Sequence, residues 1–166
     1  MMRYALVLMA ALALLAMGAE IPKEGPVHVK ALRLQADYAR GVITFSGDVV
    51  ATRGDFRLQS RELKVFLSGE GREREREVER IEATGDVKIA YGTKRAHCEK
   101  AVYYVKEEKV VLEGHPMLWE GDNRLKGGRI VVFLKEDRAI AEGIGQEQVE
   151  LTIVEKGGEG KLLPRP

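Results

Sequence analysis

The sequence contains a single cysteine, Cys98, among its 166 residues. One thiol cannot close an internal disulfide, so no disulfide framework holds the fold together. Unpaired cysteines are often buried and behave there as small apolar side chains. We therefore expect Cys98 to lie in the core and to have no chemical role.

The chain also lacks an excess of charge of one sign. It has 27 Lys and Arg residues against 26 Asp and Glu residues, which gives a formal net charge of +1. Proteins that bind nucleic acids contact many phosphates at once and depend on a large positive excess. A nearly neutral chain therefore argues against DNA or RNA as a partner.

Histidine is scarce as well. His28, His97 and His115 are far apart in the sequence, with neither the close pair of histidines nor the adjacent carboxylate cluster that a zinc site usually shows. We interpret all three as surface residues. The sequence predicts no metal site and no other cofactor.

The N-terminal segment differs from the rest of the chain. Arg3 gives a positive start, residues 4–17 are apolar or small, and Ala16-Met17-Gly18-Ala19 offers small residues to a signal peptidase. We predict a secretory signal peptide over residues 1–19. An uncleaved anchor is the alternative, although the apolar run is shorter than the roughly 20 residues of a spanning helix. Gly, Pro and Lys residues near the C-terminus predict a flexible tail over 155–166, which leaves 20–154 as one domain.

What the sequence does have is an internal repeat marked by glycines. The spacing from Gly85 to Gly114 equals that from Gly114 to Gly143, and the interval before Gly85 is longer by about the length of a charged run near residues 72–77. A second glycine follows at a constant distance in each of the first three copies, at Gly54, Gly92 and Gly121. Self-similarity at a fixed period is typical of stacked structural units that share one core.

Each copy reads as two strands. Between the paired glycines, apolar and polar residues alternate, which is typical of a strand with one buried face. After the second glycine another strand follows, and its apolar set changes parity partway along. The small residues Ser60, Cys98 and Gly127 come just before this change. A shift by one residue is what a β-bulge or corner produces, so we expect the second strand to bend there.

These patterns predict an all-β protein: an elongated β-jellyroll, or folded-over antiparallel sheet, built from stacked two-strand repeats with an apolar lining. Its terminal strands would be open edges, which invite head-to-tail pairing between molecules by β-augmentation. The first edge strand is predicted to contain Val27, Val29, Leu32 and Leu34, and the last Val149, Leu151 and Ile153.

The order of the repeat motifs resembles the periplasmic lipopolysaccharide-transport protein A family, the OstA-like domain, over roughly residues 30–145. The residues that carry this resemblance are Ala36-Asp37-Tyr38, Ser46-Gly47-Asp48, Gly54-Asp55-Phe56, Ala83-Thr84-Gly85-Asp86-Val87, Leu112-Glu113-Gly114-His115-Pro116 and Gly128-Arg129-Ile130-Val131-Val132. The charged insertion at residues 69–77 and the Gly- and Pro-containing tail depart from the family pattern.

The resemblance implies a β-jellyroll that carries lipopolysaccharide or a related glycolipid across the periplasm, between an inner-membrane export complex and an outer-membrane translocon that share this fold. The lipid-binding residues would be the inward apolar ones. They are Ile43, Phe45, Val49, Phe56, Leu58, Val65, Ile81, Ile89, Tyr91, Tyr103, Leu112, Leu118, Leu125, Ile130 and Val132. The plainer interpretation is that they form an ordinary core.

Other functions remain open from the residues alone. A jelly-roll enzyme or polysaccharide lyase would need a convergent set of acids, bases or metal ligands, whereas the inward positions here are almost wholly apolar. A structural envelope scaffold that binds only proteins is a second alternative, and the membrane-anchored partner of the same transport bridge is a third.

Two surface features also have two interpretations. The arginines of the insertion alternate with glutamates and, if extended, would share one face that meets lipid phosphates, although a solvated loop is the plainer reading. Met117 and Trp119 fall on the outward parity of the third copy and form either a contact patch or an edge covered by the tail.

Overall fold

The computed structural model describes residues 26–69, 76–136 and 138–154. The predicted signal peptide and tail lie outside these residues. Within them, no helix is long and apolar enough to cross a membrane.

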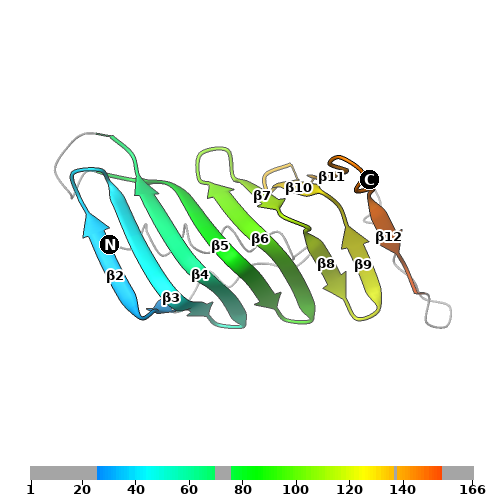
Figure 1. Ribbon diagram of the computed structural model, residues 1–166, viewed down its shortest axis with the longest axis horizontal. Coiled ribbons are helices and arrows are strands. Elements are labelled where there is room, and N and C mark those ends of the chain that lie inside the picture. The colour runs from blue at the N-terminus through cyan, green and yellow to red at the C-terminus, as the bar shows by residue number, and fades with distance from the viewer. Residues whose placement is uncertain (1–25, 70–75, 137, 155–166) are drawn as a thin grey trace.

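The described residues form twelve strands in one antiparallel sheet that does not close, which confirms the all-β prediction (Figure 1). The strands are β1 (His28–Lys30), β2 (Arg33–Asp37), β3 (Val42–Arg53), β4 (Phe56–Leu67), β5 (Val78–Tyr91), β6 (Lys94–Tyr104), β7 (Lys109–Glu113), β8 (Met117–Glu120), β9 (Asn123–Lys126), β10 (Arg129–Phe133), β11 (Arg138–Glu142) and β12 (Glu150–Thr152). The first two copies of the repeat are β3–β4 and β5–β6. The third is divided into β7 to β10.

The sheet is folded over into two halves that share the long strands β3 to β6. Half A contains β2, β7, β10 and β11 with residues 42–46, 62–67, 78–84 and 100–104 of the long strands. Half B contains β1, β8, β9 and β12 with residues 49–53, 56–60, 87–91 and 94–98. One end of β6 therefore pairs with β7 and the other with β8. Pro116, which cannot donate a ladder hydrogen bond, lies between β7 and β8.

The second strand of each repeat crosses from one half to the other with the predicted change of parity, for example from Ser60 to Leu63, while the extra residue of the bulge lies on the glycine strand. Ser46 pairs with Glu62 and Val49 with Ser60, so Gly47 and Asp48 together face Arg61. Both bulge residues are left-handed, with φ of 81° and 47°. Glycine adopts this conformation without steric cost, which explains why the extra residue lies on that strand.

The repeated glycine also allows a close approach between neighbouring strands. A Cβ atom at Gly47, Gly85 or Gly114 would lie 2.8, 2.8 or 2.4 Å from side-chain atoms of Leu32, Arg61 or Glu99, respectively. Gly85 and Gly114 therefore lie against a side chain of the preceding strand, and Gly47 lies against Leu32 in the connection between β1 and β2. These contacts form a row across the sheet where it folds over, and this row accounts for the repeat seen in the sequence.

The core lies between the two halves. Buried apolar side chains from β3 to β7 and β10 form a single cluster, which includes Leu63, Leu112 and Ile130 at 1% exposure or less. Cys98 is fully buried in this cluster, as predicted, and burial raises the pKa of its thiol to about 12. Alternate residues of each strand supply the cluster, because successive side chains point to opposite faces of a sheet.

Candidate functional site

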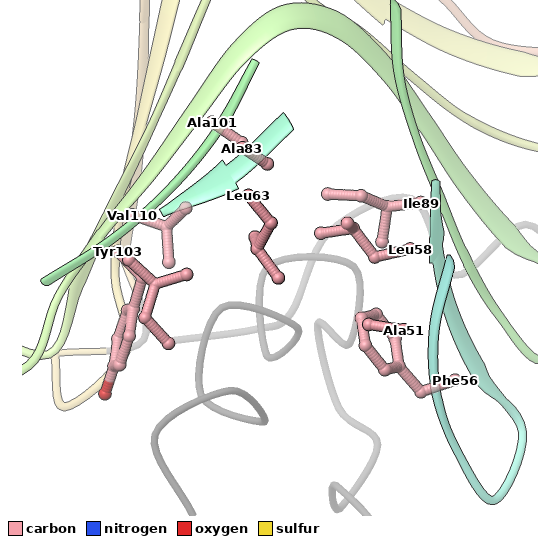
Figure 2. Close-up of a pocket in the computed structure, with 10 residues that line it drawn as sticks. Ala51, Phe56, Leu58, Leu63, Ala83, Ile89, Ala101, Tyr103 and Val110 are labelled. Carbon is pink, nitrogen blue, oxygen red and sulfur yellow. The ribbon is translucent and has the colours of Figure 1, made fainter. Parts of the chain in front are cut away.

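An apolar pocket lies between the two halves of the folded sheet. It contains about 380 Å³ of space free of protein atoms, part of which is open to solvent. In Figure 2 its side chains point toward one another from opposite walls. The lining residues are Ala51, Phe56, Leu58, Leu63, Ile81, Ala83, Ile89, Ala101, Tyr103 and Val110.

All of the residues predicted to line the interior do face it, although the pocket itself is smaller than the predicted set. Phe56, Leu58, Ile81, Ile89 and Tyr103 line the pocket. The fully buried members that lie outside its lining are Val49, Val65, Leu112, Ile130 and Val132, and the half-buried members that pack against the cluster are Ile43, Phe45, Tyr91, Leu118 and Leu125. Contact with a lipid stays a prediction for every one of them.

The predicted site omitted some of the pocket lining, above all its small residues. Ala83 and Ala101 are paired across β5 and β6, and both lie with Leu63 in the part of the pocket nearest the fold (Figure 2). Ala51 and Val110 complete the omitted set. The alternating pattern had placed these residues inward, so the signal was present. Selecting the larger side chains missed the three alanines, although small residues are the ones that leave space. Leu63 and Val110 were omitted although residues of the same size, Leu58 and Val49, were included.

The pocket lining has few polar or titratable groups. The Tyr103 hydroxyl is its one titratable group, and burial, with a smaller effect of Glu108, raises the pKa of Tyr103 to about 12. Tyr103 is therefore neutral at physiological pH. Since the other lining side chains are aliphatic or aromatic hydrocarbons, the lining suits an apolar guest.

The sheet ends in two open edges. The N-terminal edge consists of β1 and β2, with Leu32 at 81% exposure and Leu34 exposed beside it, while Val27 and Val29 are half-buried. The C-terminal edge consists of β12 in half B and, in addition to the prediction, β11 in half A. Val149, Leu151 and Ile153 are exposed there, Leu151 at 58%. Both ends thus expose large apolar side chains beside unpaired strand edges.

The histidines fit a surface location, and two of them have carboxylate partners that the sequence did not reveal. His28 and His115 are exposed. His97 Nε2 is 2.7 Å from Asp86 Oδ1, and this hydrogen bond is the main cause of the lowered pKa of Asp86. His115 Nδ1 contacts the Glu147 carboxylate. Among residues 26–69, 76–136 and 138–154, no group of His, Cys, Asp or Glu side chains is placed to hold a metal ion.

The two ambiguous surface features are only partly described. Residues 70–75 of the charged insertion lie outside the described residues, but Arg76 Nη1 donates a hydrogen bond of 2.5 Å to the Tyr38 carbonyl oxygen, and so contacts the turn after β2. Met117 and Trp119 are half-buried. Trp119 pairs with Arg95 of β6 and Arg124 of β9 across the sheet.

Taken together, the fold is an open β-jellyroll of stacked two-strand repeats around an apolar interior. The profile of the family described as "LptA/(LptD N-terminal domain) LPS transport protein" matches residues 28–138. The chain belongs to this family, which confirms the resemblance seen in the sequence.

Named relatives agree with this assignment, and a solved structure shares the fold. The lipopolysaccharide export system proteins LptA of Escherichia coli K12 and of Shigella flexneri are each 28% identical to the chain over 119 residues. These matches cover 68% of the chain and 62% of each relative. The crystal structure of LptH, the LptA-homologous periplasmic component of the lipopolysaccharide transport device of Pseudomonas aeruginosa, has a TM-score of 0.65 at 19% identity. The match covers 79% of this chain and 96% of that structure, and this likeness shows the fold.

Proposed function

We propose that the protein is a periplasmic carrier that binds lipopolysaccharide or a related glycolipid in its apolar interior and passes it from inner-membrane to outer-membrane transport components. The observation that carries this proposal is the hydrocarbon-lined pocket inside a sheet that does not close. Family membership and the printed names of the relatives point to the same ligand class.

The physical requirement for such a carrier is a dry surface for acyl chains. Exposure of one chain of about twelve carbons to water costs on the order of 10 kcal/mol, at roughly 0.8 kcal/mol per methylene. The interior residues of both halves supply that surface. Sugars and phosphates stay outside the roll, because the pocket lining has almost no polar atoms to replace their hydration.

Transfer along a bridge requires that the interior of one domain continue into the next. Eight strands follow one another in the main path of the sheet, and at a spacing of about 4.8 Å they span roughly 35 Å. This length is short for a periplasm, so we propose that copies of the chain, or partner domains with the same fold, join end to end. The exposed edges β1–β2 and β11–β12 are the strands that would pair by β-augmentation.

Site-specific photo-crosslinking in cells tests the carrier function. A photoreactive residue at Ile89 or Leu118, on the interior face, should form adducts with glycolipid. Lys88 is the matched control, because it neighbours Ile89 on β5 but points to the outer face. Adducts with protein alone from all three positions would favour the scaffold alternative. Lipid extraction from the purified protein, followed by mass spectrometry, identifies the guest.

The mature N-terminus distinguishes the two candidate positions in the bridge. A protein released into the periplasm loses residues 1–19, whereas a membrane-anchored partner keeps its N-terminal segment. Intact-mass measurement of the protein isolated from the periplasmic fraction separates the two. Retention of the segment would contradict the prediction of a cleaved signal peptide.

A further inference from the structure

A ladder of alternating rings and cations runs across half A. The pairing registers place one residue of each strand directly opposite the next, from β4 through β5, β6, β7 and β10 to β11. We call these residues the rim ladder. In order across the sheet they are Phe66, Arg80, Tyr104, Lys109, Phe133 and Arg138.

The rim ladder lies on the outer face, one residue away from the apolar interior. Arg80 precedes Ile81, Tyr104 follows Tyr103 and Lys109 precedes Val110, and each of these inward neighbours is at most 5% exposed. The ladder is also at the end of half A remote from the fold, because its residues lie at the strand ends opposite the glycine bulges. A molecule that reaches from the interior to the rim ladder must therefore cross the free edge of half A, at the strand ends remote from the fold.

Each cation in the ladder lies over the ring on the strand before it. The Arg80 guanidinium carbon is 3.8 Å from the Phe66 ring centroid, Lys109 Nζ is 4.8 Å from that of Tyr104, and the Arg138 guanidinium carbon is 4.4 Å from that of Phe133. These distances are typical of cation–π contacts. All three of these contacts lie in half A.

The ring contacts use the faces of the cations and not their N–H donors. An arginine that stacks its face on a ring keeps its in-plane N–H groups, which match the oxygens of a phosphate. Carboxylates occupy some of these donors: Arg80 Nε donates to Glu82 at 3.0 Å, and Arg138 Nε and Nη2 both contact Glu136, at 3.0 and 2.8 Å. The other guanidinium N–H groups are not used in these contacts. The side chains of Arg80 and Arg138 are still 31% and 51% exposed. The ladder is thus a row of preorganised cations that solvent can reach.

We infer that the rim ladder binds the phosphorylated head group of the glycolipid whose acyl chains occupy the interior. This inference rests on the proposed carrier function. An amphiphile with its chains between the two walls has its polar end at the free margin, where Arg80, Lys109 and Arg138 supply positive charge beside the apolar pocket. The rings fix where that charge lies. Half A, and not half B, then sets the orientation of the head group.

The test compares two variants with the same loss of charge. The ladder variant is Arg80→Gln, Lys109→Gln and Arg138→Gln. The control variant is Arg57→Gln, Arg124→Gln and Lys126→Gln, at exposed positions of half B whose sequence neighbours face the interior. The probes are lipid A with both phosphates and the same lipid after both phosphates have been removed. Circular dichroism and urea unfolding establish that both variants are folded.

The ladder variant should bind the phosphorylated lipid about tenfold to a hundredfold more weakly than the wild type, through loss of charge-assisted hydrogen bonds, and should bind the dephosphorylated lipid unchanged. The control variant should bind both lipids within about twofold of the wild type. Two results would overturn the head-group role and leave the carrier function standing. One is that both variants bind the phosphorylated lipid equally weakly, and the other is that the ladder variant loses the same affinity for both lipids. Failure of the wild type to bind either lipid would overturn the carrier function itself.

A measurement on the wild type alone keeps the inference testable if the ladder variant does not fold. Salt screens solvent-exposed ionic contacts and leaves apolar burial largely intact. Raising the salt concentration should therefore weaken binding of the phosphorylated lipid but not of the dephosphorylated one. If binding of both lipids depended on salt in the same way, the rim ladder would not be the site that distinguishes the phosphorylated lipid from the dephosphorylated one.

Discussion

The close approach at the glycine bulges predicts an unusual stability difference between two Gly→Ala variants. Gly114 and Gly121 are both left-handed, with φ of 76° and 58°. In each, alanine must adopt a conformation that costs L-residues about 1–2 kcal/mol. A Cβ at Gly121 would meet nothing within 4 Å, whereas one at Gly114 would lie 2.4 Å from Glu99 Cβ and 3.3 Å from Glu99 Cα.

The two variants therefore share the backbone term and differ in the clash. Rotation of the Glu99 side chain does not move its Cβ, so the strands themselves must separate, and overpacking of this kind typically adds 1–3 kcal/mol. We expect Gly121→Ala to lower the free energy of unfolding by about 1–2 kcal/mol. Gly114→Ala should lower it by about 2–5 kcal/mol.

Urea unfolding followed by the fluorescence of Trp119, the only tryptophan, measures both values. The double variant Glu99→Gly with Gly114→Ala removes the clashing Cβ and should recover part of the loss, which a double-mutant cycle quantifies. Equal midpoint shifts for Gly114→Ala and Gly121→Ala, or no recovery in the double variant, would refute the close approach as the reason for the repeated glycine.

Further predictions concern the interior. Ala83→Leu and Ala101→Leu add side-chain volume to the pocket and should each lower lipid affinity at least about tenfold while the fold is kept, as measured by lipid titration of folded protein; unchanged affinity would show that the guest lies elsewhere. Cys98 should react with a thiol reagent only when the protein unfolds, because it is buried with a pKa of about 12; rapid labelling of the native protein would contradict this. The pKa of Tyr103 is raised from its ordinary value of 10 to about 12, so its contribution to stability is complete below pH 10 and is lost between pH 10 and 12. Tyr103→Phe should therefore show a smaller loss of stability in urea over that pH range than the wild type, and equal losses would exclude burial as the cause.

The sequence determined the strands well because both of its signals were periodic. Alternation by two fixed the inward parity of β3 to β6, and the glycine period fixed the stacking. It predicted the change of parity in β4 and β6 but did not show that the extra residue lies on the glycine strand, since a change of parity in one strand and an extra residue in its neighbour produce the same offset between them. Only the pairing of Ser46 with Glu62 and of Val49 with Ser60 shows which strand contains the bulge.

The sequence predicted which face of each strand would line the site, but not which residues of that face line the pocket. Whether an inward residue lines free space depends on how well the side chains of the two walls fill the volume between them. Predicting this requires the distances between strands, which no sequence pattern records. The alanine pair Ala83–Ala101 shows the part played by pairing, since the two small side chains leave space together only because they are neighbours on β5 and β6 of the same wall. The rim ladder was hidden for the same reason. Its members come from six separate strands, and only the pairing registers of those strands bring them into one row.

The same registers connect the fold to the proposed transport role. Because a strand presents successive residues to opposite faces, the residue next to each inward side chain must face outward. A repeat that places an apolar residue inside at the margin of half A therefore also places its neighbour outside, at a fixed distance, in every strand. Rings and cations at those outward positions give the head group of an amphiphile a row of contacts parallel to the row that its chains occupy. A lipid that moves along the stack would then keep both sets of contacts at each step, which a sealed core or a randomly charged outer face does not provide.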